Sequence, residues 1–136
     1  DLALSDAVQR LVATAPGARL ACVTVLRTAR IGLDSNIDAE GRNRHLKRLA
    51  GLRDWARTLA LPDHRITFHV LESPDIADAL IEYARSNAID HLIMGARGVT
   101  GVRRLLGSVS ARVVAEAGCT ITVVRARGEA AATTSP

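Results

Sequence analysis

The pattern of apolar and polar positions alternates between two kinds of segment along the chain. Four short runs are almost continuously apolar and rich in β-branched residues, as buried strands are: residues 19–26, 65–71, 89–94 and 119–125. The segments between them place apolar residues three or four positions apart, which is typical of helices with one buried face. These predicted helices are residues 5–15, residues 39–60, a segment that begins at residues 73–75, and residues 107–117.

Short polar residues mark where two of these helices begin. Ser5 or Asp6 can cap the first helix. Ser73 is expected to cap the third, with Pro74 at its first helical position. The helical residues expected to face the core are Val8, Leu11, Val12, Leu49, Leu52, Ala56, Leu59, Ile76, Leu80, Tyr83, Ala84, Val109, Val113 and Ala117.

The alternation of helices and strands predicts an α/β fold, an open and mostly parallel sheet with helices on both faces. A helix comes first along the chain, whereas a doubly wound sheet normally begins with a strand, and that strand is usually central. We therefore expect the first strand to be missing or to lie upstream of residue 1. Residues 1–127 are expected to form one domain, and the small, polar residues 128–136 a disordered tail.

The composition excludes several classes of protein. A chain of 136 residues, 48% hydrophobic, has the size of one domain, and no apolar run approaches the ~18–20 residues of a membrane span. The two cysteines and four histidines show no metal-ligand spacing, and a reduced, cytoplasmic protein is expected. Three aromatic residues are few for a protein that stacks nucleic-acid bases.

Charge is distributed unevenly along the chain. The net charge is +4, and Lys47 is the single lysine among 18 basic residues. Residues 61–94 carry six acids and two arginines, whereas residues 95–127 carry six arginines and one acid. This asymmetry predicts that anions are bound by the last third of the chain.

The most informative stretch is IMGARGVTGVRRLLGSVSARVV, residues 93–114. It begins at the carboxyl end of a predicted strand, where ligands bind in open α/β sheets. Gly95 and Gly98 allow a tight turn and a close approach of the backbone to a ligand, and Arg97, Arg103 and Arg104 add positive charge.

Gly107 and Ser108 open the helix that follows this loop, and Ser108 is expected to cap it. Free amide groups at a helix start suit a phosphate, and the Ser108 and Ser110 hydroxyls can add donors. The spacing matches neither the P-loop nor the GxGxxG pattern, so the sequence does not indicate an NTPase.

The stretch resembles the nucleotide loop of the universal stress protein family, Gly-x2-Gly-x9-Gly-Ser/Thr. Gly95, Gly98, Gly107 and Ser108 match its fixed positions, and the resemblance extends from about residue 5 to residue 125. Two departures are visible. Eight residues rather than nine separate Gly98 from Gly107, and Thr120 stands where the family usually has proline.

The resemblance implies a Rossmann-like, five-stranded sheet of order 3-2-1-4-5 and an adenine-nucleotide site at its carboxyl edge. It implies that Val25 contacts adenine through its backbone, that Met94 lines the base pocket, and that Asp1 is the acidic residue ending the first strand. The full set of implied nucleotide-binding residues is Asp1, Val25, Met94, Gly95, Arg97, Gly98, Gly107, Ser108, Val109 and Ser110.

The function expected from the resemblance is that of a regulatory module in the stress response. The ligand would be ATP or another adenine nucleotide, with or without Mg²⁺, and turnover would be no more than slow ATP hydrolysis. The resemblance also implies a homodimer formed through Ile121, Val123 and Val124 of the last strand, and an unidentified protein partner.

Two alternatives belong to other classes of protein. One is a nucleotide-free dimerisation or docking domain, appended to a larger protein such as a kinase or transporter. The other is an enzyme that uses an adenine cofactor, similar to electron-transfer flavoproteins; no catalytic grouping of residues supports it. Neither nucleic acid nor membrane is an expected partner.

Overall fold

Helices and strands alternate along the chain in the computed structural model, which describes residues 2–28, 39–96 and 107–125. Two single-turn 3₁₀ helices, η1 (Arg57–Leu59) and η2 (Asp63–Arg65), lie between α2 and β2. The other elements are, in chain order, α1 (Leu2–Ala13), β1 (Leu20–Arg27), α2 (Ala39–Ala56), β2 (Ile66–Ser73), α3 (Ile76–Ser86), β3 (His91–Gly95), α4 (Ser108–Glu116) and β4 (Thr120–Val124). The predicted α/β class is confirmed.

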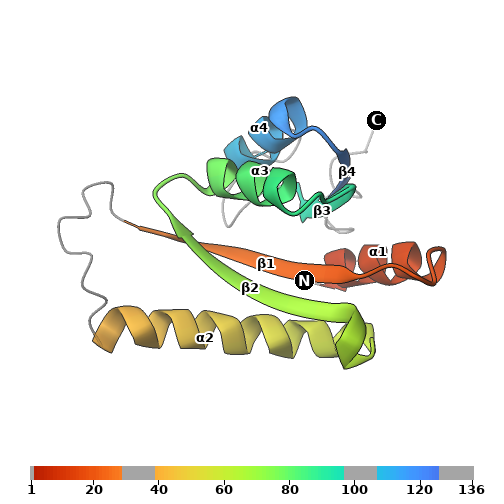
Figure 1. Cartoon of the computed structure of the whole chain (residues 1–136), viewed down its shortest axis with the longest axis horizontal. Helices are drawn as coiled ribbons and strands as arrows, with labels where there is room; N and C mark the ends of the chain where they lie inside the picture. The colour runs from red at the N-terminus through yellow and green to blue at the C-terminus, as the bar shows by residue number, and fades with distance from the viewer. Residues whose placement is uncertain (1, 29–38, 97–106, 126–136) are drawn as a thin grey trace, which may run out of the picture.

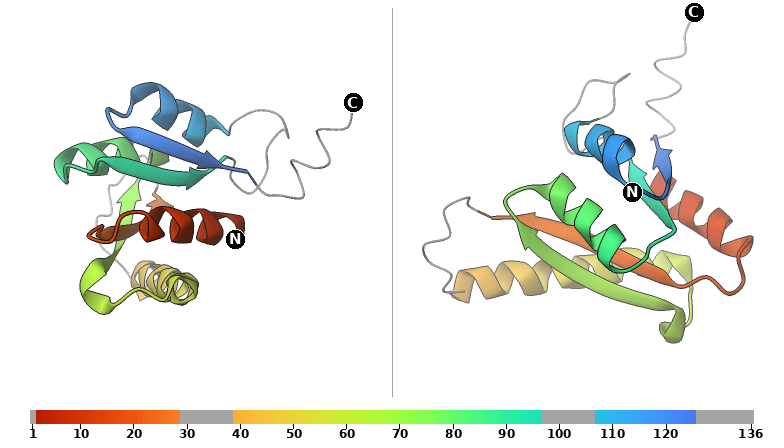
Figure 2. Two further views of the ribbon diagram at one scale, coloured as in Figure 1. Left: turned by 90° about the vertical axis from the view of Figure 1, so that its right-hand side faces the viewer. Right: turned by 45° about the horizontal axis from the view of Figure 1, so that its top comes forward.

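The four described strands form two parallel pairs. β1 pairs with β2, from Leu20 opposite Ile66 onward, and β3 pairs with β4, from His91 opposite Thr120 onward. The second pair is rotated relative to the first (Figures 1 and 2). The described strands therefore form two separate pairs and not the single sheet of five strands that was predicted. Neither β1 nor β3 has a second partner among the described strands.

Helices cover both faces of the strand pairs. α2 packs against β1 and β2, and α3 contacts the same two strands from the other side (Figure 1). α1 contacts β3 and β4, and α4 lies on the opposite side of that pair (Figure 2). None of the helices in the described ranges combines the length and the apolar composition of a membrane span.

A small apolar cluster joins the two strand pairs. Val8 of α1, Cys22 of β1, Ala56 and Leu59 are buried together, and Ile93 of β3 packs against them. This agrees with the predicted core stripe of the long helix. Because Ile93 faces α1 and α2, the alternation of side chains along β3 directs Met94 toward the side of α4.

The start of α1 differs from the sequence prediction. The helix begins at Leu2, so neither Ser5 nor Asp6 caps it. Ser5 is 2% exposed, and its Oγ lies 2.7 Å from Thr58 Oγ1. Gln9 Nε2 donates to the carbonyl of Thr58 at 2.6 Å. The serine that the pattern assigns to a cap therefore ties α1 to η1 instead.

The start of α3 also differs from the prediction. The N-cap is Asp75, whose Oδ1 accepts a hydrogen bond from the Asp78 amide at 3.0 Å. Ser73 Oγ accepts from the Asp75 amide at 3.1 Å and donates to the Asp75 carbonyl at 2.9 Å. Ser73 therefore closes the turn between β2 and α3, and Pro74 precedes the helix.

Truncation of Val113 to alanine is expected to destabilise the protein, because Val113 is 0% exposed. The loss of two carbon atoms from a packed site should cost about 2 kcal/mol of unfolding free energy. The neighbouring Val114 is 45% exposed, so Val114→Ala should change stability by no more than about 0.5 kcal/mol. Urea unfolding of both variants measures the difference, and equal losses would contradict the described burial.

The two free cysteines are expected to react differently with an alkylating reagent. Burial raises the pKa of the Cys22 thiol to about 11, whereas Cys119 is only half-buried. The thiolate is the reactive form, so iodoacetamide at pH 8 should modify Cys119 and leave Cys22 intact in the folded protein. Peptide mass spectrometry reads this out, with a urea-unfolded sample, in which both react, as the control.

Candidate functional site

The carboxyl end of β3 and the amino end of α4 meet at a hydrogen-bonded junction. The Ala96 amide donates to the Val124 carbonyl at 2.8 Å and thereby prolongs the β3–β4 ladder. The Gly107 amide donates to the Ala96 carbonyl, also at 2.8 Å. Residues 96 and 107 are thus held together, and α4 starts where β3 ends.

Ser110 of α4 hydrogen-bonds to the end of β3 and stabilises this junction. Its side chain is buried, and its Oγ lies 3.0 Å from the Gly95 carbonyl and 2.7 Å from the Ala96 carbonyl. The single hydroxyl proton is therefore used within the protein. This differs from the expectation that the Ser110 hydroxyl donates to a phosphate, and it leaves the backbone amide as the donor that Ser110 can offer.

The N-cap residue of α4 offers no side chain to the backbone amides of the first turn. Gly107 is the N-cap residue, with φ −65° and ψ 164°, and it makes no side-chain cap bond. Ser108 is the first helical residue and is exposed, so the prediction that Ser108 caps the helix is wrong. The amides of residues 108–110 lack acceptors within the helix, and the helix dipole makes this end positive. Such an end suits a phosphate or another anion.

The two residues expected to contact the base lie on different strand pairs. Val25 is buried in β1 and stands opposite Leu71 of β2. Met94 is half-buried in β3 and stands opposite Val123 of β4. The structure thus brings Met94 to the β3–α4 junction, where Gly95, Gly107, Ser108, Val109 and Ser110 also lie, and leaves Val25 on the other pair.

The remaining sequence-predicted site residues, Asp1, Arg97 and Gly98, lie outside the described residues. The same holds for Arg103 and Arg104. Their roles stay predictions.

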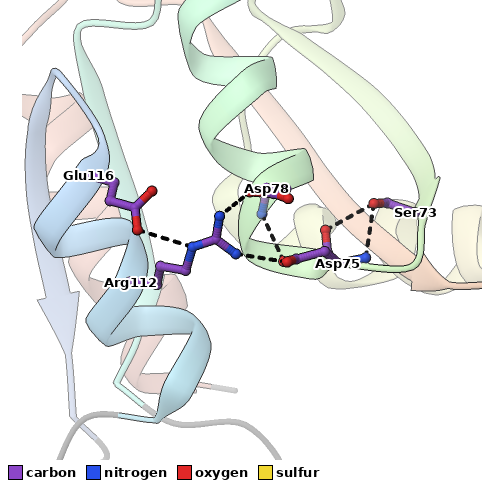
Figure 3. A network of polar contacts seen from close by, with 5 residues as sticks. All are labelled: Ser73, Asp75, Asp78, Arg112 and Glu116. Carbon is purple, nitrogen blue, oxygen red and sulfur yellow. Dashed lines mark hydrogen bonds and ion pairs between the residues drawn. The ribbon is translucent and has the colours of Figure 1, made fainter. Parts of the chain in front are cut away.

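An arginine that the sequence analysis did not select links α4 to the start of α3 (Figure 3). Arg112 Nη1 donates to Asp75 Oδ2 at 2.7 Å, and Nη2 bonds Asp78 Oδ1. Its Nε donates to Glu116 Oε2 at 3.1 Å, four residues along the same helix. The spacing of Arg112 and Glu116 is the one signal in the sequence that could have indicated part of this network.

The charges of this network shift the pKa values of its members. The hydrogen bond from the Asp78 amide, followed by that from Arg112, lowers the pKa of Asp75 below its ordinary value. The three carboxylates raise the pKa of Arg112, with the bond to Asp75 as the largest cause. Asp75 is therefore a carboxylate and Arg112 a cation throughout the physiological pH range.

Histidines and acids do not gather into a metal site within residues 2–28, 39–96 and 107–125. His69 Nε2 lies 2.9 Å from Thr67 Oγ1, and His91 Nε2 lies 2.7 Å from Thr122 Oγ1. These two histidines are therefore hydrogen-bonded polar groups.

A groove of about 410 Å³ lies between β1 and α2, away from the β3–α4 junction. None of the sequence-predicted site residues that the structure describes lines it. Its lining residues are Thr24, Leu26, Arg44, Lys47, Arg48, Gly51, Leu52 and Trp55.

Comparison with known proteins gives a consistent result. Residues 1–125 match the model of the universal stress protein family. A universal stress protein of Thermus aquaticus is 34% identical over 120 residues, which cover 88% of this chain and 86% of that protein. A universal stress protein of Methanothermobacter thermautotrophicus is 37% identical over 76 residues, 54% of this chain. The match spans only 52% of that second protein's length.

Solved structures with the same fold include a universal stress protein in complex with cAMP. It is 25% identical, has a TM-score of 0.62, and the match covers 90% of this chain and 84% of that one. The protein MJ0577 has a TM-score of 0.67 at 18% identity, with 91% and 86% of the two chains covered. The second likeness concerns the fold alone.

The lowered pKa of Asp75 predicts a contribution to acid stability. Such a contribution is complete above the ordinary pKa of the carboxyl and is lost as the pH falls through its lowered value in the folded protein. Asp75→Asn keeps a capping side chain but removes the charge. The variant should therefore have a lower Tm than wild type at pH 7, and this difference should shrink toward pH 2.

Thermal unfolding followed by circular dichroism between pH 7 and pH 2 measures this convergence. Asp54→Asn is the matched control, since Asp54 forms an exposed ion pair with Arg57 within one stretch of chain. A constant Tm difference between wild type and Asp75→Asn over the whole range would contradict the prediction.

Proposed function

Because the chain belongs to the universal stress protein family, we propose that it binds an adenine nucleotide at the amino end of α4 and acts as a regulatory module in the stress response. The observation that carries this proposal is the β3–α4 junction. There the first-turn amides of α4 stand beside the end of a parallel strand, and no side chain of the N-cap residue occupies them.

The proposed phosphate site consists mainly of backbone groups. The amides of Ser108, Val109 and Ser110 would bind the phosphate oxygens, and Gly107 would let them approach closely. The exposed Ser108 hydroxyl can add one further donor. Gly98 and Arg97 would complete this phosphate site. The ligand that we propose is ATP or another adenine nucleotide, with or without Mg²⁺.

The base and ribose would lie toward the strands. Met94 and Gly95 would border the base, Val25 would contact it through its backbone, and Asp1 would bind the ribose or the base. The relative in complex with cAMP supports an adenine ligand, because cAMP carries the same base together with a phosphate. This proposed site needs the β1–β2 pair to stand next to the β3–α4 junction.

We also propose that the two strand pairs are parts of one sheet of order β2-β1-x-β3-β4, where x is a further strand; this is the order 3-2-1-4-5 when x is counted as the first strand. β1 and β3 each have one edge without a partner among the described strands, and a strand placed between them would pair with both. Isolated two-stranded sheets are marginally stable, so such a strand would contribute strongly to stability. It would also bring Val25 and Met94 onto the same sheet.

Nucleotide binding is expected to raise the Tm of the protein. A ligand that binds only the folded state adds about 2.7 kcal/mol of stability when its concentration is a hundred times its Kd. Millimolar ATP, AMP and cAMP should be compared by thermal shift and by calorimetry. If none of these nucleotides changes the Tm of the protein, the proposed function is refuted.

Ser108→Asp is the variant that isolates the amino end of α4. A carboxylate in the first turn stabilises a helix through its dipole but repels a phosphate. The variant should therefore keep or raise the Tm without ligand and lose the nucleotide-induced shift. Ser108→Ala, which removes only the hydroxyl, should keep most of that shift. Gly107→Val should also abolish it, by placing a branched side chain beside the amides.

A homodimer is the partner arrangement we propose. β4 pairs with β3 on one edge, and its other edge has no partner among the described strands. Ile121, Val123 and Val124 of β4 are half-buried and would contact the second copy. If nucleotide leaves the Tm unchanged but substitutions on β4 dissociate a dimer, the alternative of a nucleotide-free docking domain is favoured.

A further inference from the structure

We propose that Arg112 is a positioning residue for the nucleotide site, holding the amino end of α4 against the turn between β2 and α3 and compensating the carboxylates gathered there. This inference rests on the proposed function. It names a residue that would not touch the nucleotide and would act through the helix that does.

The geometry of Arg112 suits such a role. The two Nη atoms of its guanidinium reach the carboxylates of Asp75 and Asp78, and the third donor, Nε, reaches Glu116 (Figure 3). Because both Nη atoms of the planar guanidinium are bonded, the orientation of the side chain is fixed as well as its distance from the carboxylates. A lysine ammonium cannot fix the orientation in this way. Arg112 lies one helical turn below Ser108, so the direction fixed is that of the first turn of α4.

The carboxylates that hold Arg112 are themselves anchored to the first strand pair. Asp75 caps α3 and is bound to Ser73, the last residue of β2. The Ser73 carbonyl accepts a hydrogen bond from the Thr28 amide at 3.0 Å, directly after β1. A continuous series of polar contacts thus leads from the end of β1 to α4. It joins the strand of Val25 to the proposed phosphate site.

The charge balance gives Arg112 a second effect. Asp75, Asp78 and Glu116 would be three negative charges close to α4 if the guanidinium were absent. Without the guanidinium, the carboxylates of Asp75 and Asp78 beside α4 would weaken the attraction between the helix end and a phosphate. Arg112 therefore offsets part of a charge that would otherwise oppose the ligand.

The test is the nucleotide affinity of variants, measured by calorimetry at a temperature where circular dichroism shows each to be folded. Arg112→Gln is expected to weaken ATP binding by about tenfold or more, because the helix end loses its fixed direction. Arg112→Lys keeps the positive charge but loses the planar, two-pronged guanidinium. Its affinity for ATP should lie between that of wild type and that of Arg112→Gln. Arg85→Gln is the matched control, since Arg85 pairs with Glu82 inside α3 and should leave affinity within about twofold.

A double variant, Asp75→Asn with Asp78→Asn, separates positioning from charge. It replaces the two ion pairs of Arg112 by weaker, neutral hydrogen bonds and removes two negative charges. If Arg112 positions α4, ATP affinity falls. If Arg112 only compensates charge, affinity rises, and the positioning role is overturned. This variant also decides the question if Arg112→Gln does not fold.

Two failures are distinguishable. A wild-type protein that binds no adenine nucleotide overturns the proposed function and this inference together. A wild-type protein that binds, with Arg112→Gln binding within twofold of it and only its Tm lowered, overturns this inference alone and leaves Arg112 a purely structural residue.

Discussion

The guanidinium of Arg112 bonds the helices of the two strand pairs to each other on one face of the strands. The described pairs β1–β2 and β3–β4 are not joined by a ladder, so their relative placement depends on the helices that cover them. On one face α4 is bonded through Arg112 to Asp75 and Asp78. On the other, α1 packs on β3 and β4 and bonds to Thr58. Where a complete sheet would rely on repeated backbone bonds, the two pairs are joined by the apolar cluster of Val8, Cys22, Ala56 and Leu59 and by a few directional polar contacts.

The order of helices and strands could be predicted from the sequence, because each strand is a short β-branched run and each helix has an apolar stripe. The residues at which the helices begin could not be predicted in the same way. Ser5, Ser73 and Ser108 were each predicted to cap a helix, and none of them does. A serine hydroxyl bonds equally well to its own turn, to a neighbouring loop or to a distant helix. Only the packing decides among these, and that choice is not written in the local pattern.

In the candidate site, too, local features could be predicted from the sequence and long-range contacts could not. The junction of β3 and α4 could be predicted, because Gly95, Gly107 and Ser108 are close in sequence and the glycine spacing is a local signal. The contact between Arg112 and Asp75 spans 37 residues, and its partners look like ordinary surface charges in the sequence. The place of Val25 relative to α4 is likewise a matter of tertiary structure. Local signals thus indicate where an anion can bind but not how that place is held in register with the rest of the molecule.

The buried hydroxyl of Ser110 has a consequence for covalent regulation. Protein kinases transfer a phosphoryl group to an accessible serine oxygen, and here two neighbouring serines at one helix start differ completely in access. Ser108 is exposed, whereas Ser110 is 3% exposed and bonded to the carbonyls that end β3. A kinase could reach Ser110 only after α4 had separated from β3. Of these two serines, only Ser108 could therefore be phosphorylated in the folded protein, and the added dianion would lie at the first-turn amides of α4.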